Sequence, residues 1–441
     1  MTLESAVNEY FERMWELGQK LGEEGITYSP KIKVHVNGHY DDNGIYTVTS
    51  YNHVNYRQKS PNLQAYLGID DINKTEAFNQ IFAEMDKVIQ HDSAKKESLK
   101  LDLDFLAGQA LFKGCNNSPK SDAAEMGKRF IDYALRRPMR FHNTAYLSGL
   151  AVPEKNVNLG AGISIRRTGK EDFELVSDPL EPRPGQFSFF NQGITCAMEF
   201  DISGDQIRAR MNVDEELRRY TAILRLFASS PVWSLRREGA GLGTTISTRY
   251  VGRSVYKLSE EKISDLLAFW NAAGETHIKR LMNNREDYLA YSFNQYSELV
   301  VFQGPPPLVV GQLIAILESI YKFEERSNSS TVKQRASKLL GLVGFNPLEV
   351  HKTLNDAYSI RNKVFHGEAT DAKTNAEATE LTRSLFDYVR LSILIFLYVA
   401  DKKNFLKTLS DSLLDHSLEE KIRVVLKGNE LLPLQSTKIA I

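Results

Sequence analysis

From Glu260 to the end of the chain, segment after segment carries the apolar spacing of a helix, and strand signals fade. Helices are expected at about 261–273, 277–297, 308–323, 331–342, 347–366, 376–408 and 417–427. A series of amphipathic helices buries its apolar stripes by packing helix against helix. We therefore expect an all-α domain over residues 276–441, with the proline run 305–307 as a loop within the bundle.

Residues 1–275 mix helix and strand patterns instead. Helices are expected at 3–21, 75–91, 121–137 and 214–228, and short strands between 146 and 202. Alternating β-formers at 31–36 and 45–54 are separated by Asn-Gly and Asp-Asn-Gly turn signals, which predicts a hairpin. The fold class is therefore expected to be α+β: a mixed N-terminal region, either one unit or two subdomains divided near 140–150, followed by the helical bundle.

Charge and composition limit the partners of the 441-residue chain. It holds 55 Lys and Arg against 56 Asp and Glu, so bulk positive charge cannot hold a polyanion, and any contact with nucleic acid must be local. Cys115 and Cys196 form no CxxC pair, which argues against a disulfide framework. The most apolar run, Leu391–Ala400, is about half of the roughly 20 residues that cross a bilayer. With no secretory signal visible, we expect a cytoplasmic protein without a membrane partner.

One basic segment in the N-terminal region is a candidate RNA contact. It surrounds Gly239-Ala-Gly-Leu-Gly243, which lacks the Lys-Ser/Thr of a phosphate-binding P-loop and is expected to be a turn between strands. The alternative to an RNA contact is an ordinary solvated strand face. The candidate RNA-binding residues are Arg236, Arg237, Arg249 and Arg253.

The chemistry-bearing pattern lies at the end of the predicted helix 347–366. Asn346-Pro347 supplies a helix N-cap and first-turn proline, and Gly367 is a C-cap signal. Arg361 falls on the apolar stripe of this helix, where an arginine needs an anion, either a structural carboxylate or a bound phosphate. His366 falls in the final turn, near solvent.

Five residues separate Arg361 from His366, so an ideal helix turns their side chains apart by about 140 degrees and separates them by about 7.5 Å of rise. Unwinding of the helix end at Gly367 or a two-fold dimer that pairs two such helices would bring the groups together. Two imidazoles and two guanidiniums could remove a proton from a ribose 2′-OH, donate a proton and stabilise charge without a metal.

The segment Tyr358-Ser-Ile-Arg361-Asn362-Lys-Val-Phe-His366-Gly367 resembles the Arg-x4-6-His motif of HEPN domains, and its Arg-Asn-x3-His-Gly form resembles the Apea-like branch. The resemblance covers roughly residues 276–410, and its specific part is confined to these ten positions. It implies a helical bundle that acts as a metal-independent endoribonuclease, often in anti-phage abortive infection, and assembles as a homodimer or higher even oligomer.

The same resemblance assigns roles. Arg361, His366 and Asn362 are the expected catalytic residues, and Glu318, Lys322 and Tyr358 are expected to support them. Glu318 and Lys322 also fit an ordinary exposed i,i+4 pair. Host or phage RNA, with tRNA among the candidates, and a phage-derived trigger are the expected partners, and no cofactor or metal is expected. The alternative is a non-catalytic HEPN module that binds a nucleotide or RNA or supports dimerisation, regulated by the N-terminal region.

Overall fold

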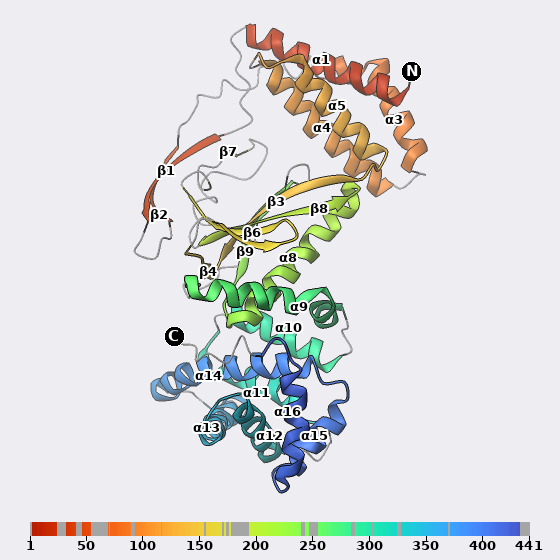
Figure 1. Cartoon of the computed structure of the whole chain (residues 1–441). Coiled ribbons are helices and arrows are strands. Elements are labelled where there is room, and N and C mark those ends of the chain that lie inside the picture. Colours follow the sequence, from red (N-terminus) through yellow and green to blue (C-terminus); the bar gives the residue numbers. More distant parts are fainter. Residues whose placement is uncertain are drawn as a thin grey trace.

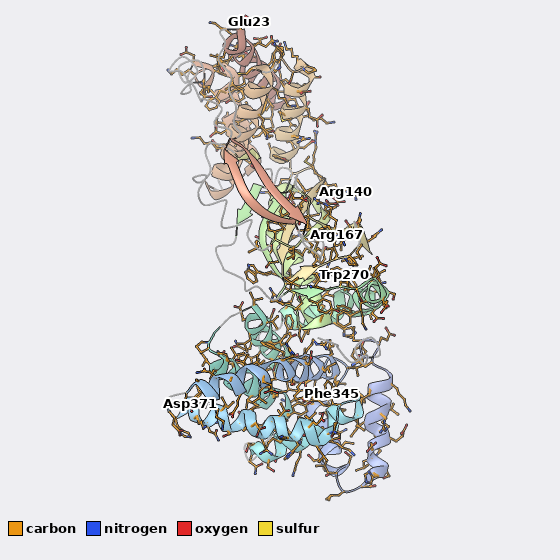
Figure 2. All side chains as sticks on the ribbon, turned by 90° about the vertical axis from the view of Figure 1, so that its left-hand side faces the viewer. Glu23, Arg140, Arg167, Trp270, Phe345 and Asp371 are labelled. Atoms are coloured by element: carbon orange, nitrogen blue, oxygen red, sulfur yellow. The ribbon has the colours of Figure 1, made fainter. Side chains whose placement is uncertain are left out.

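The computed structural model has the predicted α+β class. The molecule is elongated, and its regions follow one another along its length in the order of the chain (Figure 1). Helices from the N-terminal part lie at one end, antiparallel strands lie in the middle, and the C-terminal helices form the other end. Figure 2 shows the same order from another side, with Glu23 at the first end, Arg140 in the sheet and Asp371 in the C-terminal helices. The structure describes residues 2–23, 32–40, 46–53, 69, 71–89, 93–115, 117–153, 156–169, 172, 176–177, 194–239, 243–246, 255–283, 287–301, 304–323, 328–368 and 371–432.

The N-terminal helices pack on one another: α1 (Leu3–Glu23), α3 (Glu76–Ile89), α4 (Ser93–Cys115) and α5 (Lys120–Ala134). The sequence predicts all of these except α4, whose apolar residues do not gather on one stripe. Helix α4 is stabilised by its neighbours, and glycines permit its close approach to α1. A Cβ on Gly18 would lie 2.1 Å from the carbonyl oxygen of Leu111, and one on Gly114 would lie 2.1 Å from that of Trp15.

Two sheets follow in the middle of the molecule. The predicted hairpin is confirmed as β1 (Ile32–Tyr40) paired antiparallel with β2 (Tyr46–His53), but the predicted turn at Asn37-Gly38 is wrong, because these residues pair within β1 at a shift of register. Strand β7 (Val176–Ser177) lies along the other edge of β1. A larger antiparallel sheet has the order β10-β9-β3-β8-β6-β5. Its strands are β3 (Met139–Ser148), β5 (Asn156–Gly160), β6 (Ile163–Arg167), β8 (Cys196–Gly204), β9 (Trp233–Gly239) and β10 (Gly243–Ile246). A short parallel pair joins β4 (Leu150–Ala151) to β11 (Tyr256–Lys257).

Helix α8 (Gln206–Ala228) packs against the larger sheet, where the ring of Phe200 meets that of Tyr220 edge-on at 5.3 Å. The predicted start at Asp214 is wrong. The helix begins eight residues earlier, because the side chain of Asp205 accepts a hydrogen bond from the Arg208 amide and caps the first turn. The predicted turn around 239–243 joins the paired strands β9 and β10, and residues 240–242 themselves lie outside the described part.

The rest of the chain is helical, as predicted. Its helices are α9 (Ile263–Asn283), α10 (Tyr288–Val301), α11 (Pro306–Tyr321), α12 (Ser329–Leu342), α13 (Pro347–Phe365), α14 (Ala372–Phe396), α15 (Lys402–Asp411) and α16 (Glu419–Lys427), with 3₁₀ turns at 260–262 and 416–418. None of the described helices has the length and apolar character needed to span a membrane. Cys115 and Cys196 are both buried, and no disulfide joins them.

Several helix boundaries differ from prediction, and the predicted helix 277–297 is divided between the end of α9 and α10. Helix α9 runs through residues 274–276, where the sequence predicts an interruption, because burial of Ala273, Ile278 and Leu281 outweighs the roughly 1 kcal/mol helix penalty of Gly274. The predicted helix 376–408 is two helices, with α15 beginning at the Asp401 N-cap. Residue 276, the predicted domain boundary, therefore lies inside a continuous helix, and the division into domains stays a prediction.

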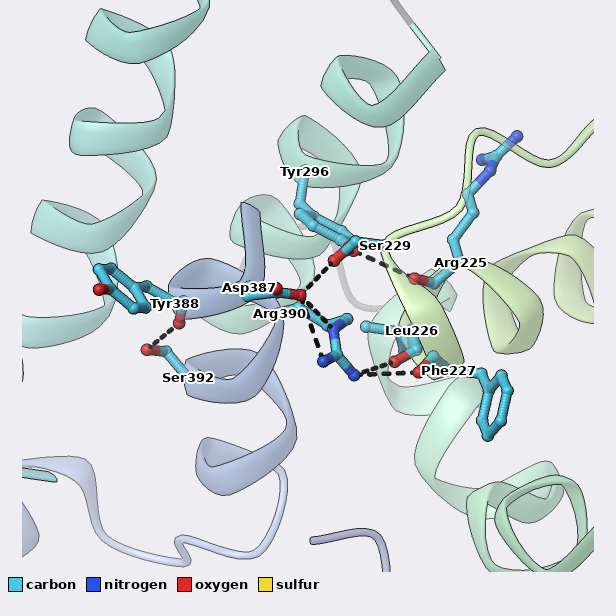
Figure 3. A network of polar contacts seen from close by, with 9 residues as sticks. All are labelled: Arg225, Leu226, Phe227, Ser229, Tyr296, Asp387, Tyr388, Arg390 and Ser392. Carbon is cyan, nitrogen blue, oxygen red and sulfur yellow. Dashed lines mark hydrogen bonds and ion pairs between the residues drawn. The ribbon is translucent and has the colours of Figure 1, made fainter. Parts of the chain in front are cut away.

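A buried polar joint connects α8 to the C-terminal helices, and Figure 3 shows all of its members except Ser297. Arg390 of α14 is fully buried, and its Nη1 donates to the carbonyl oxygens of Leu226 at 3.1 Å and Phe227 at 3.0 Å. These carbonyls belong to the last turn of α8, where helix groups lack partners within the helix. Asp387 Oδ1 lies 3.3 Å from Arg390 Nη2 and accepts a hydrogen bond from Ser229 Oγ at 3.1 Å.

Helix α10 completes this joint. The Tyr296 hydroxyl lies 3.1 Å from the carbonyl oxygen of Arg225 and 3.2 Å from Ser229 Oγ, and Arg225 Nη1 donates to Ser297 Oγ at 2.5 Å. Hydrogen bonds of this kind depend on direction, so they hold the end of α8 in one orientation against α10 and α14. We use the name α8–α14 joint for Arg225, Leu226, Phe227, Ser229, Tyr296, Ser297, Asp387 and Arg390.

Candidate functional site

Helix α13 begins as the sequence predicts. Asn346 is its N-cap, with Oδ1 accepting from the Leu348 amide at 3.0 Å, and Pro347 occupies the first turn. The apolar stripe then buries Val350, Leu354, Ala357 and Tyr358 against the bundle. These contacts fix the rotation of α13, and thereby the direction in which its last turn presents its side chains.

The end of α13 explains where His366 lies. His366 is the C-cap residue, and Gly367 follows with a φ of +72°, a left-handed conformation that glycine adopts without strain. The Glu368 amide donates to the Lys363 carbonyl at 3.0 Å, and the Gly367 amide donates to the Val364 carbonyl at 3.1 Å. This pair of hydrogen bonds is the Schellman motif. It turns the chain away after His366, whose side chain is exposed at the helix end, as predicted.

Glu318, in the last turn of α11, gathers three predicted site residues. Its Oε1 accepts from the Tyr358 hydroxyl at 3.1 Å and lies 3.0 Å from Lys322 Nζ, while its Oε2 lies 3.9 Å from Arg361 Nη2. The predicted i,i+4 pair of Glu318 and Lys322 is therefore present, but the Glu318 side chain is only 18% exposed and also contacts Tyr358 and Arg361. Burial and the Glu318 charge hold the pKa of Tyr358 well above its usual value, so this hydroxyl remains a donor.

Arg361 lies at the edge of the bundle, with 33% of its side chain exposed. Its Nη1 donates to Asn362 Oδ1 at 3.2 Å, and its guanidinium carbon lies 4.9 Å from the centre of the Phe365 ring. Its Nε is buried and has no hydrogen-bond acceptor among the described residues. The predicted place on the apolar stripe is thus only partly correct. The 3.9 Å distance between Arg361 Nη2 and Glu318 Oε2 is longer than a hydrogen bond, so this ion pair is not hydrogen-bonded.

Within one chain, the described contacts do not join Arg361 to His366. The His366 amide still donates to the Asn362 carbonyl at 3.0 Å, so helical hydrogen bonding continues through position 366. Any unwinding at Gly367 therefore comes after His366 and leaves the predicted rotation of about 140 degrees in place. The predicted contribution of a second copy of the chain, like the reach of the Arg361 side chain, stays a prediction.

Of the four arginines predicted to contact RNA near residues 236–253, the structure describes the side chain of Arg237, which is buried. Arg237 is 5% exposed, and its Nε lies 3.3 Å from Asp214 Oδ1 on α8. Successive strand residues point to opposite faces, and the register of β9 directs Arg237 toward the helix-covered face. The expectation of a surface cation is wrong for Arg237. The side chain of Arg236, and Arg249 and Arg253 altogether, lie outside the described residues.

Two residues beside the site have no role in the sequence prediction. The sequence places Phe365 on the buried stripe, yet the structure leaves it 58% exposed, because α13 ends there and the chain turns away. Gly311 of α11 lies under this ring: a Cβ on Gly311 would lie 3.0 Å from Phe365 Cε2. The contact of Phe365 with Arg361 could be predicted from their i,i+4 spacing, whereas nothing in the sequence around Gly311 indicates its contact with Phe365.

The described residues form no metal site, and no known protein matches the chain. The part of the chain that the structure describes holds no group of three or more His, Cys, Asp or Glu side chains suited to a metal ion. Comparisons with family models, curated proteins and solved structures found no match to this chain. The resemblance of residues 358–367 to the HEPN motif rests on their sequence.

Proposed function

We propose that the chain is a metal-independent endoribonuclease of the Apea-like HEPN type that acts in anti-phage defence. The observation that carries this proposal is the state of Arg361. Glu318, its nearest carboxylate, is already bound by Tyr358 and Lys322, so the Arg361 charge stays available to an external anion. A partly exposed guanidinium five residues from an exposed imidazole suits a phosphodiester substrate.

The chemistry follows from these groups. His366 takes the proton from a ribose 2′-OH, whose oxygen attacks the adjacent phosphorus, while a second imidazole protonates the departing 5′-oxygen. Arg361 stabilises the charge of the pentavalent phosphorane, and Asn362, which accepts from Arg361 Nη1, orients the guanidinium. The products are a 2′,3′-cyclic phosphate and a 5′-hydroxyl.

The second imidazole comes from a second copy of the chain in this proposal. A two-fold dimer that apposes two α13 ends brings together two arginines and two histidines, which one chain separates by rotation on the helix. The N-terminal region restrains the site until a phage-derived trigger acts. Cleavage of host or phage RNA, with tRNA among the candidates, then halts infection.

One observation favours the non-catalytic alternative. Among the described residues, no hydrogen-bond partner orients the His366 imidazole, whereas a general base is usually held by a neighbouring group. A module that only binds a nucleotide or RNA through Arg361 needs no such orientation. The two functions differ in whether RNA is cut or merely bound.

The test is incubation of purified protein with total tRNA in EDTA, with and without phage lysate as trigger. Arg361→Ala and His366→Ala are expected to abolish cleavage, whereas His351→Ala, on the same helix but 15 positions away in the chain, leaves it intact. Mapping of RNA ends checks for the 2′,3′-cyclic phosphate. Intact RNA under every condition refutes the nuclease function, and cleavage that EDTA removes refutes the metal-free mechanism. Full activity of a monomer refutes the composite site.

A further inference from the structure

Phe365 is exposed, but it is held in place. A lone exposed apolar side chain is ordinary on a protein surface, so its 58% exposure means little by itself. Its contacts are more informative. The guanidinium carbon of Arg361 lies 4.9 Å from the centre of the ring. The Cε2 edge of the ring packs on Gly311, where a Cβ would lie 3.0 Å from it.

These contacts orient the ring while leaving more than half of the residue accessible. Helix α13 supplies the attachment, Gly311 of α11 supplies the support at one edge, and Arg361 supplies a cation at a face. A ring ordered in this way loses little further conformational freedom when a flat ligand covers it. The ring and the Arg361 guanidinium thus form one surface at the end of α13, and His366, the next residue, is also exposed there.

That combination has a chemical match. Unpaired nucleobases stack on aromatic side chains and on guanidinium planes, and the phosphates beside them bind to cations. We propose that Phe365 stacks an unpaired base of RNA next to the phosphate that Arg361 binds. The inference rests on the proposed function for its ligand and adds a substrate rule: the RNA is single-stranded at this position, in a loop, a bulge or an end.

Base-paired RNA does not meet this rule, because its bases are stacked on each other and its grooves present edges rather than faces. A second copy of the chain is the competing occupant of Phe365, since a dimer interface also buries exposed aromatic rings. The two occupants predict different results for oligomeric state, which makes them separable in one set of variants.

The experiment measures binding rather than cleavage. A fluorescein-labelled single-stranded RNA with a 2′-O-methyl group at each sugar has no free 2′-OH to attack the phosphate, so anisotropy titration reports affinity alone. Phe365→Leu keeps apolar contact with Gly311 and is expected to weaken binding about 5- to 150-fold, the range for loss of one stacked base. Phe365→Trp retains affinity within about 2-fold. Leu348→Ala, an 80% exposed control at the other end of α13, leaves it unchanged.

A duplex of the same sequence and sedimentation of each variant complete the design. Wild-type protein and Phe365→Leu are expected to bind the duplex equally. Equal affinity of these two proteins for the single strand overturns the proposal, as does loss of a dimer in Phe365→Leu that Phe365→Trp does not share. Tight, Phe365-dependent binding without RNA cleavage keeps the stacking role and removes the nuclease function. Cleavage that is indifferent to Phe365→Leu, with equal binding, removes the stacking role alone.

Discussion

Replacing Arg390 with methionine tests whether the α8–α14 joint holds the two regions together. Methionine preserves the apolar stem of the side chain within α14 and removes the charged head. The change leaves the Leu226 and Phe227 carbonyls without the donor that binds them at 3.1 and 3.0 Å. It also leaves Asp387, which is 15% exposed, without the guanidinium 3.3 Å away.

The expected loss is large because Arg390 is fully buried. Removing one partner of a buried, hydrogen-bonded charge pair destabilises proteins by about 3–5 kcal/mol, since the other charge stays buried without compensation. Asp387→Asn in the same chain removes that uncompensated charge. The double variant is therefore expected to lose less stability than the sum of the two single variants.

Urea unfolding followed by two signals provides the assay. All three tryptophans, Trp15, Trp233 and Trp270, precede residue 276, so fluorescence reports the N-terminal region, while far-ultraviolet circular dichroism reports helices throughout. With an m-value of about 3 kcal/mol per molar urea, Arg390→Met lowers both midpoints by about 1–1.7 M. The matched control is Arg383→Met, which changes an exposed arginine of the same helix. Equal midpoints for these two variants would refute the reasoning.

Three further perturbations have expected signs. Gly18→Ala places a Cβ 2.1 Å from a backbone oxygen of α4 and is expected to lower the unfolding free energy by about 1–3 kcal/mol. The Cβ of Gly108→Ala meets nothing within 4 Å, so this change is expected to raise the unfolding free energy by about 0.5–1 kcal/mol. Thermal unfolding that ranks the two variants in the opposite order contradicts the packing argument. Asn346→Ala removes the N-cap of α13 and lowers the unfolding free energy by about 1 kcal/mol; an unchanged urea midpoint would mean that the cap is not needed. Burial lowers the pKa of Lys402 to about 8, so above that pH the unfolded chain binds more protons than the folded chain. The unfolding free energy of the wild type is therefore expected to rise by about 2 kcal/mol from pH 7 to 9.5 relative to that of Lys402→Met. Parallel curves of unfolding free energy against pH for the two proteins would exclude this effect.

Features set by neighbouring residues could be predicted from the sequence. The start of α13 follows from Asn346-Pro347 and its end from Gly367, because capping uses hydrogen bonds within a few residues of each terminus. The hairpin of β1 and β2 follows from turn residues between alternating strands. The approach of Glu318 to the motif also agrees with the sequence prediction, which drew on the HEPN resemblance rather than on spacing.

Features set by packing between distant segments could not be predicted. Helix α4 lacks a strong apolar stripe and depends on α1, which glycines allow to come close. Arg237 is buried because the register of β9 directs it toward α8, and a shift by one residue would have exposed it. Phe365 has the periodicity of a core residue, and its exposure depends on where the neighbouring helices end. In each case the deciding contact lies far away in the chain.

The candidate site draws on two helix ends with different supports. The last turn of α11, which carries Glu318, is held by Lys402 Nζ on the Ser319 carbonyl at 2.7 Å and by Arg335 Nη1 on the Tyr321 carbonyl at 2.8 Å. Cations at a helix C-terminus favour this arrangement. The end of α13 instead leads through residues 369–370 into α14, the helix that Arg390 ties to α8. Ser392, two residues after Arg390, shares a hydrogen bond of 2.9 Å with the Tyr321 hydroxyl in the last turn of α11, so a movement of α8 that α14 transmits also acts on the helix that carries Glu318. Restraint by the N-terminal region, as proposed, would then work by changing the position of Glu318 relative to Arg361.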